Sequence, residues 1–444
     1  MLAYNINDKC WYLPLKKLIV KTSKRINNKE FANSISNKWL KQFKDSTIRE
    51  IPDADTNFKN IYPYCIGLIP TNECNLRCLY CYSNAGEHMK IELSKIKIDN
   101  VINLLIRNAI IHKRIRNKDI VSELTISGGG EPTYNWDKFK YIVDTFKYKC
   151  KKYNINNKII LVTNGMKGKR KIDYILENID QINLSFDGPK KIQNIQRPSR
   201  NNKGSFKMVD EFIKTCEEKG KEISTRSTIL PENFNNLVNI CDFIFEKYSN
   251  VNIAHIEPLF LVGRGENFKE TPLDKMLEFM VSYIDTYNYI NKKYSGKILY
   301  NSTFIYNVQE YYCSASLGLK PWVHMDGSII PCTDYITKDN LKIGYVKDSG
   351  INYNSNYTGM SLCLKKCKNC FAYYQCGGGC VHNIVKDING DCASAYSQAY
   401  CNMIKKFWEK AILAMSQGKS FCGMKPEPID VNGEKGLKSA YLIK

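Results

Sequence analysis

Short β-rich runs alternate with helical segments between residues 64 and 265, and this alternation limits the fold more than any other feature of the chain. The predicted strands lie at residues 65–69, 123–127, 158–163, 181–186, 222–229 and 252–257. Intervening segments such as 93–116 and 136–153 carry apolar residues at helical spacing. Strand–helix alternation of this kind produces parallel βαβ units. The sequence therefore predicts an α/β fold whose parallel sheet is either open or closed into a barrel.

The segments on either side of this repeat differ from it. Residues 10–13 and 18–21 form a hairpin-like pair, and a polar stretch that we expect to be helical runs from there to about Lys44. A further helix is predicted at residues 273–289. Beyond Tyr300, cysteine, glycine and tyrosine become dense while long periodic segments fade. We expect a second domain there, held together by metal more than by an apolar core.

These observations divide the chain into four predicted parts. They are an N-terminal extension at 1–60, an α/β core at 61–299, a cysteine-rich domain at 300–410 and a C-terminal tail at 411–444. The tail is expected to be loosely ordered after Cys422.

The chain contains eighteen cysteines and five histidines. No apolar run approaches the ~18 residues of a membrane helix, and the N-terminus has no secretory pattern, so we expect a cytoplasmic protein and no membrane partner. Thiols in a reducing compartment are not stored as disulfides, which favours metal ligands or reactive thiols. Sites made only of cysteine suit iron–sulfur clusters or structural zinc.

The formal net charge is +21, which by itself would favour an acidic partner such as nucleic acid or an acidic peptide. Lysine, asparagine and isoleucine are scattered throughout, as in proteins from AT-rich genomes, and no block of five or six basic residues occurs. The net charge alone therefore does not identify a binding partner, and we do not expect nucleic acid to be one.

The first cysteine group follows the first predicted strand in the segment TNECNLRCLYCYSNAG. Its spacing, C-x3-C-x2-C, places Cys74, Cys78 and Cys81 on one tight loop. Iron–sulfur clusters normally take four cysteines, so a three-cysteine loop implies one iron with an open coordination position. A zinc loop is the alternative, with Cys65 within range as a fourth ligand.

This spacing, with the aromatic Tyr80 before the third cysteine, resembles the signature of the radical S-adenosylmethionine (SAM) superfamily. The resemblance implies that Cys74, Cys78 and Cys81 hold a 4Fe–4S cluster whose open iron is chelated by SAM. In that family, one electron splits the sulfonium and gives a 5′-deoxyadenosyl radical that abstracts hydrogen from the substrate. The cofactor carries the difficult chemistry, and the protein supplies orientation and tuning.

Further motifs at the ends of predicted strands extend the resemblance over roughly residues 64–260 and imply a partial (β/α)6 barrel. In SGGGEPT, Gly129, Gly130 and Glu131 resemble the motif that binds the methionine amino group. Glycines allow close backbone approach to a ligand, and a carboxylate suits an ammonium group. The other implied cofactor contacts are Asn164 in TNG, Ser185 at the ribose, Arg197 at the cofactor carboxylate and Leu259 at the adenine.

The second cysteine group lies in CKNCFAYYQCGGGC. Together with flanking cysteines it resembles the SPASM domain, which holds auxiliary clusters in radical enzymes that modify peptides and proteins. The resemblance implies one cluster on Cys367, Cys370, Cys376 and Cys401, and another on Cys313, Cys332 and Cys380. The second cluster is either three-coordinate with an open iron or completed by Cys363, Cys392 or the substrate.

The function implied is that of a peptide maturase. Such an enzyme abstracts hydrogen from a residue of a ribosomally made precursor and forms a thioether or carbon–carbon crosslink. Its expected partners are the precursor, with an acidic leader bound by residues 1–60, and an electron donor such as flavodoxin or ferredoxin. The alternative is an anaerobic sulfatase-maturating enzyme that produces formylglycine; here PCTD sets Asp334 one residue away from the position of that family's base. A third hypothesis, from a different functional class, is a zinc-stabilised binding module that has no catalytic activity.

Overall fold

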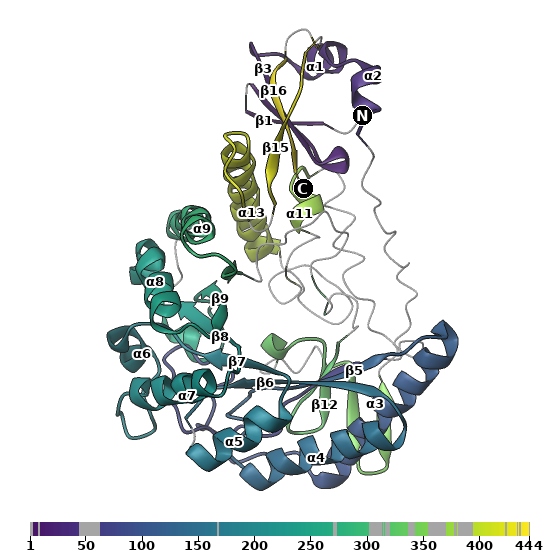
Figure 1. Cartoon of the computed structure of the whole chain (residues 1–444), viewed down its shortest axis with the longest axis vertical. Coiled ribbons are helices and arrows are strands. Elements are labelled where there is room, and N and C mark those ends of the chain that lie inside the picture. The colour runs from purple at the N-terminus through teal and green to yellow at the C-terminus, as the bar shows by residue number, and fades with distance from the viewer. Residues whose placement is uncertain are drawn as a thin grey trace.

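The computed structural model describes residues 3–7, 9–43, 63–166, 168–269, 273–301, 313, 315, 320–335, 342–353, 370–376, 380, 394–421, 424–432, 434 and 437–443. These residues form two sheets, one at each end of the molecule in Figure 1.

Six parallel strands form the centre of the larger sheet and confirm the predicted α/β fold. They pair in chain order as β4 (Cys65–Leu68), β5 (Val121–Ile126), β6 (Asn156–Thr163), β7 (Gln181–Ser185), β8 (Ile223–Ile229) and β9 (Val251–Pro258). Each begins and ends within two residues of the predicted bounds. Buried Ile and Leu side chains on these strands form part of the main apolar core.

Helices connect the successive strands and lie along the outside of the sheet (Figure 1). They are α3 (Lys95–Arg116), α4 (Trp136–Lys152), α5 (Lys169–Asn178), α6 (Lys190–Gln196), α7 (Phe206–Glu218) and α8 (Leu237–Lys247). In α3, Ser94 caps the first turn by accepting a hydrogen bond from the Lys97 amide, and Ile98, Val101 and Ile102 are buried. These side chains recur at the spacing that places them on one helix face.

No pairing between the described strands closes the larger sheet into a complete barrel. Strand β10 (Ile298–Tyr300) extends it beside β9. At the other side, β11 (Trp322–Val323) pairs with β4 in parallel, followed by antiparallel β12 (Ser328–Ile330), β13 (Gly344–Lys347) and β14 (Gly350–Tyr353). The sheet thus crosses the boundary that we predicted near residue 300.

The smaller sheet combines both ends of the chain. Its order is β1 (Tyr4–Asn7), β2 (Cys10–Leu13), β3 (Leu18–Thr22), β16 (Leu437–Ile443) and β15 (Pro426–Ile429). The β2–β3 pair confirms the predicted hairpin. The expectation of a loosely ordered tail is wrong, because β16 pairs with β3 in antiparallel register and buries Ala440 against the N-terminal segment.

The helix expected before Lys44 is two short helices, α1 (Asn28–Ser34) and α2 (Asn37–Leu40). They are separated at Ile35, which is extended, and the Ser36 hydroxyl accepts a hydrogen bond from the Trp39 amide to begin the second helix. Serine competes with helical backbone bonding in this way. Together with the sheet, these helices enclose a small core that contains Trp11 and Phe31, whose rings stack 4.0 Å apart.

The remaining helices lie between the two sheets or beside the larger one. They are α9 (Leu273–Lys293), which confirms the helix predicted at 273–289, α11 (Tyr373–Cys376) and α13 (Ser394–Met415), with 3-10 turns at Pro14–Lys16, Pro231–Asn236, Gly263–Asn267 and Thr333–Tyr335. Buried Phe407 and Trp408 of α13 belong to the same core as the barrel strands. Among the described helices, none combines the length and apolarity needed to cross a bilayer.

Candidate active site

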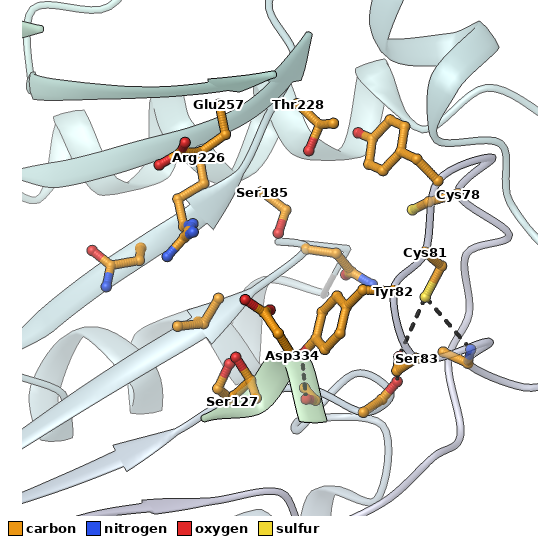
Figure 2. A pocket seen from close by; sticks show the side chains of 18 of the residues that line it. Cys78, Cys81, Tyr82, Ser83, Ser127, Ser185, Arg226, Thr228, Glu257 and Asp334 are labelled. Atoms are coloured by element: carbon orange, nitrogen blue, oxygen red, sulfur yellow. Dashed lines mark hydrogen bonds between the residues drawn. The ribbon is translucent and has the colours of Figure 1, made fainter. Parts of the chain in front are cut away.

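A cavity of about 800 Å³ lies at the carboxyl ends of the parallel strands (Figure 2). Ligands of α/β folds bind at this edge, where loops from successive strands converge. The cavity is lined by the residues predicted from the first motifs: Cys74, Cys78, Tyr80, Cys81, Gly129, Gly130, Glu131, Asn164, Ser185, Arg197 and Leu259. Cys313, Cys332 and Cys380 of the second cysteine group line it too.

The loop that carries Cys74, Cys78 and Cys81 follows β4 and is held by two arginines. The Arg77 guanidinium donates to the carbonyls of Cys74 and Gly86, at 3.0 and 2.9 Å. Arg264 donates through Nε to the Cys78 carbonyl at 2.8 Å. Fixing the backbone at several points presents the three thiols to the cavity with little freedom.

Polar groups surround two of the loop's sulfur atoms. The Leu76 amide lies 3.4 Å from the Cys74 sulfur, and the Ala85 amide lies 3.5 Å from the Cys81 sulfur. Burial raises the pKa of the Cys78 thiol to about 11 and also raises that of Cys74. Without a bound cation these thiols are therefore protonated at neutral pH, and metal binding must release their protons.

These residues fit an iron–sulfur cluster. Donors aimed at sulfur stabilise thiolate ligands and tune the cluster that they hold. Among the described residues, no three potential ligand side chains converge closely enough to hold a single metal ion, as a zinc site would need. A cubane cluster instead takes each thiolate on a different iron, which suits ligands spread along a loop.

The glycine run after β5 packs directly against the cysteine loop. The Gly130 amide donates to the Thr71 carbonyl at 2.8 Å, and a Cβ atom at Gly130 would collide with the Glu73 carbonyl. Glycine is therefore required there by close backbone approach. On the other side, the Ser83 hydroxyl donates to the Gly129 carbonyl.

The Glu131 carboxylate is buried and accepts several protein hydrogen bonds. Its donors are the Thr163 hydroxyl and the Asn164 amide, each at 2.8 Å, and both the amide and the hydroxyl of Thr133. This carboxylate thus joins the ends of β5 and β6. The contact of Glu131 with the cofactor amino group stays a prediction. The side-chain amide of Asn164 donates to Asn75 Oδ1 at 2.8 Å, and its predicted contact with the cofactor also stays a prediction.

Arg197 is paired with a carboxylate that the sequence prediction missed. Its Nε and Nη2 atoms lie 3.0 Å from the two oxygens of Asp187, which is fully buried. The Tyr80 hydroxyl and the Gln196 side-chain amide also donate to Asp187. The Asp187 position in LSFDGP, next to the predicted Ser185, was the available signal. The predicted role of Arg197 at the cofactor carboxylate stays a prediction.

Ser185 and Leu259 are the remaining predicted cofactor contacts, and both line the cavity. Ser185 ends β7 and points into the cavity (Figure 2). Leu259 follows β9 and packs with Tyr80 and Leu230 in a small apolar cluster. Such a cluster offers the flat apolar surface that an adenine ring needs.

Arg226 and Glu257 are polar cavity residues that the sequence prediction did not name. Arg226 lies in the middle of β8, and the carboxylate of Glu257 in β9 is in hydrogen-bond contact with Nε2 of His255. A signal was present in the sequence ISTRSTI, because Ser224, Arg226 and Thr228 alternate and so share one face of the strand. Of these three, Arg226 and Thr228 line the cavity and make this part of it polar.

The second cysteine group is partly described. Cys313, Cys332 and Cys380 share one wall of the cavity, and Cys313 and Cys380 both raise the pKa of Cys332, although burial is the larger cause. Cys370 and Cys376 lie at α11 and pack against the main core, and Cys370 is close enough to influence the pKa of Cys401. Cys363, Cys367 and Cys392 lie outside the described residues. The two auxiliary clusters stay a prediction.

Comparison with known proteins defines the class. The family model described as the Radical SAM superfamily matches residues 68–244, which run from the last residue of β4 into α8 and include the cysteine loop. This stretch is a radical SAM domain, as the cysteine motif predicted. The class implies a 4Fe–4S cluster and SAM as cofactors.

Two characterised relatives are similar to this chain in sequence. The chain is 25% identical to the cysteine-type anaerobic sulfatase-maturating enzyme of Clostridium novyi over 365 residues, which cover 77% of this chain and 93% of that enzyme. It is 27% identical to the radical SAM cyclopropyl synthase TigE of Paramaledivibacter caminithermalis over 235 residues, half of this chain and 46% of that one.

Solved structures share the fold. The sulfatase-maturating enzyme anSMEcpe with bound AdoMet and Kp18Cys peptide superposes with a TM-score of 0.60 at 16% identity, covering 80% of this chain and 99% of that one. Streptococcus suis SuiB bound to S-adenosylmethionine superposes with a TM-score of 0.55 at 16% identity, covering 88% and 99%. The fold is therefore that of these two radical SAM enzymes.

Proposed function

We propose that this enzyme is a peptide maturase that abstracts hydrogen from a residue of a ribosomally made precursor and forms a thioether or carbon–carbon crosslink. One observation carries the proposal: Cys313, Cys332 and Cys380 line the same cavity as the three cysteines of the first group. A peptide residue between them can lose hydrogen at one wall while a neighbouring thiol is held at the other.

The residues of the first wall have the groups needed to hold the cofactor. In this proposal Cys74, Cys78 and Cys81 ligate the reactive cluster, and bound SAM supplies the 5′-deoxyadenosyl radical. Glu131 and the adjacent glycine carbonyls orient the amino group, and Ser185 and Leu259 orient the ribose and adenine. Arg197, fixed by Asp187, presents positive charge beside the Tyr80 ring, whose centroid is 5.2 Å from the guanidinium carbon.

The second wall would hold a substrate thiol. We assign one auxiliary cluster to Cys313, Cys332 and Cys380, and another to Cys367, Cys370, Cys376 and Cys401. The first set supplies three thiolates, which leaves one iron position for a thiolate of the peptide.

The relatives support a peptide as the substrate. SuiB has been solved bound to the precursor peptide SuiA, and its superposition on this chain has a TM-score of 0.51. SuiB matches 88% of this chain, against 80% for anSMEcpe. We propose that residues 1–60, together with the β15–β16 strands that complete their sheet, form an accessory unit that binds the precursor.

Formylglycine synthesis is the second candidate, and a specific residue favours it. Asp334 lies at the cavity beside Cys332, with Tyr82 close by (Figure 2). A carboxylate there can accept the proton that leaves a Cys or Ser side chain during oxidation to the aldehyde. The sulfatase-maturating relatives match most of their own length.

Mass spectrometry of a treated peptide separates the two functions. The anaerobically reconstituted enzyme is incubated with SAM, reductant and the peptide encoded by a short cysteine-rich reading frame beside the gene. A crosslink removes a hydrogen pair and retains the sulfur, whereas formylglycine from cysteine loses the sulfur and reacts with hydrazides. An unchanged peptide mass with that substrate and with a sulfatase-derived peptide would contradict both functions.

A further inference from the structure

The cluster loop has an outer surface as well as a cavity side. A radical SAM cluster must receive one electron for each cleavage of SAM, and an external donor must approach the loop closely to deliver it. We propose that the surface over this loop binds a small, acidic one-electron-carrier protein of the flavodoxin or ferredoxin type. We call this surface the loop–α6 face and define it by Leu79, Lys190, Lys191, Ile195, Arg200 and Lys203.

Backbone hydrogen bonds place the two segments of this face side by side. The Leu79 amide donates to the Gln196 carbonyl at 2.9 Å, and the Arg200 amide donates to the Asn75 carbonyl at 2.9 Å. Between them, Leu76 and Ser199 form an antiparallel bridge. The segment after α6 therefore runs along the cysteine loop, and the face begins one residue from Cys78.

Two apolar side chains lie exposed at the centre of the face. Leu79, between two of the predicted cluster ligands, is 39% exposed, and Ile195 on α6 is 55% exposed. Lys191 precedes Ile195 by four residues and so projects from the same side of the helix. Apolar residues surrounded by charged ones are typical of surfaces that bind another protein transiently.

The charge of the face is one-sided. Between Gly188 and Lys207 the sequence contains six Lys or Arg residues and no Asp or Glu. Of these, Arg197 is buried, pairs with Asp187 and lines the cavity, so it does not belong to the outer face. Lys190, Lys191, Arg200 and Lys203 are exposed and form no ion pair with any residue that the structure describes. The nearby Glu87 is paired with Arg264.

This one-sided charge suits an acidic carrier. Complementary charge accelerates the encounter of two proteins by about 10- to 1,000-fold at low ionic strength, while the exposed Leu79 and Ile195 supply the short-range contact. In the step itself, the reduced carrier loses one electron and the cluster gains it, and no atom or proton is transferred. The carrier then leaves, and the face is free for the next encounter.

Charge reversal at Lys191 and Arg200 tests the proposal. Holoenzyme carrying Lys191→Glu and Arg200→Glu is mixed in a stopped-flow apparatus with flavodoxin hydroquinone, and cluster reduction is followed by absorbance and by electron paramagnetic resonance. We expect the second-order rate constant to fall by about 10-fold at low salt and to approach that of the unmodified enzyme at about 0.5 M salt, where surface charges are screened.

The matched control is Arg114→Glu with Lys118→Glu, which removes the same charge at the far end of α3, away from α6 in Figure 1. It should leave the reduction rate near that of the unmodified enzyme. Equal loss in both double variants would show that only net charge matters and would overturn the docking site. Ile195→Ser provides a second test, because it should weaken carrier binding, measured by calorimetry, at every salt concentration.

Two further results keep this inference separate from the peptide proposal. Dithionite is a small reductant that needs no docking site, so dithionite-driven cleavage of SAM should be unchanged in Lys191→Glu/Arg200→Glu. If the peptide proposal fails, the carrier results are unaffected, since they rest on the radical SAM class alone. Tight, salt-sensitive binding of RNA to the face, with no binding of flavodoxin, would overturn the inference.

Discussion

At the scale of single residues, Asp187 organises the wall of the cavity. The Tyr80 hydroxyl, the Gln196 amide and the Arg197 guanidinium all donate to it, and no part of its side chain reaches solvent. Burial alone would lower the pKa of Arg197, but the Asp187 carboxylate, together with Tyr80 and Cys78, more than offsets burial and raises this pKa. A buried ion pair of this kind fixes geometry more than it adds stability.

Removing one charge of this pair should be costly. Asp187→Asn leaves the Arg197 guanidinium buried without a counter-charge, and we expect the free energy of unfolding to fall by about 3 kcal/mol. Urea denaturation measures the change. The matched control is Asp119→Asn, which breaks an exposed pair with Lys113 at 2.9 Å and should cost less than about 1 kcal/mol. Equal costs at the two sites would contradict the assigned role of Asp187.

The His255 ring should make stability depend on pH. Its pKa lies below the ordinary value of 6.5, first because of burial and then because of Arg226, although Glu257 opposes the shift. As the pH falls below about 6.5, the unfolded chain therefore takes up a proton before the folded chain does, and stability is lost. Above about pH 6.5, the neutral His255 ring makes its full contribution to the stability of the folded protein.

The His255→Gln variant tests this titration. Its urea midpoint should decline less than that of the unmodified protein between pH 7.5 and pH 5.5, because one group that charges on unfolding has been removed. A variant with the same decline would assign the pH dependence to other groups.

At the scale of elements, local patterns predicted the strands and helices whose partners are near in sequence. Strands β4 to β9 and helices α3 and α4 have long apolar periodicities and could be predicted within two residues. Strand β16 could not, because LKSAYLI gives no hint that it pairs with β3, more than 400 residues earlier. Strands β11 and β12, with two and three residues, are too short to show a period.

The residues of the candidate site also fall into those that local sequence patterns predicted and those that they did not. Cys74, Cys78 and Cys81 could be predicted because their ligand spacing is local, and the glycine run marks its own turn. Arg226 and Glu257 could not be assigned to the cavity, because only the pairing of β8 with β9 brings these two strand positions to the same cavity. The role of Asp187 could not be predicted either, because it depends on the contact with Arg197, which only the folded structure shows.

A charge in the core of the smaller sheet tests whether this sheet is a separate unit. Ala440 is 1% exposed beside Trp11 and Val20, so Ala440→Asp should open β1–β3 and β16 locally, at a cost of about 2–4 kcal/mol. Hydrogen exchange should then rise in these strands while β4–β9 stay protected. Lys438→Asp, at an exposed position of the same strand, is the control. Faster exchange throughout the barrel would contradict local opening.

At the scale of the whole molecule, the structure brings two cysteine groups, separated by more than 200 residues, onto one cavity. The barrel strands supply the first wall, and the β11–β14 extension of the same sheet holds the segment that supplies Cys332 for the second. The smaller sheet and the loop–α6 face lie outside this cavity. Substrate recognition, electron supply and hydrogen abstraction would therefore use different surfaces of one chain.

We assign the reactive cluster to Cys74, Cys78 and Cys81 and propose two auxiliary clusters beside it. Iron and sulfide analysis with Mössbauer spectroscopy, performed on the anaerobically reconstituted protein and on its triple alanine variant, tests it most directly. We predict about twelve irons per unmodified chain and roughly four fewer in the variant. The variant should also make no 5′-deoxyadenosine from SAM. Stoichiometric zinc with almost no iron, or normal 5′-deoxyadenosine production by the variant, would contradict the claim.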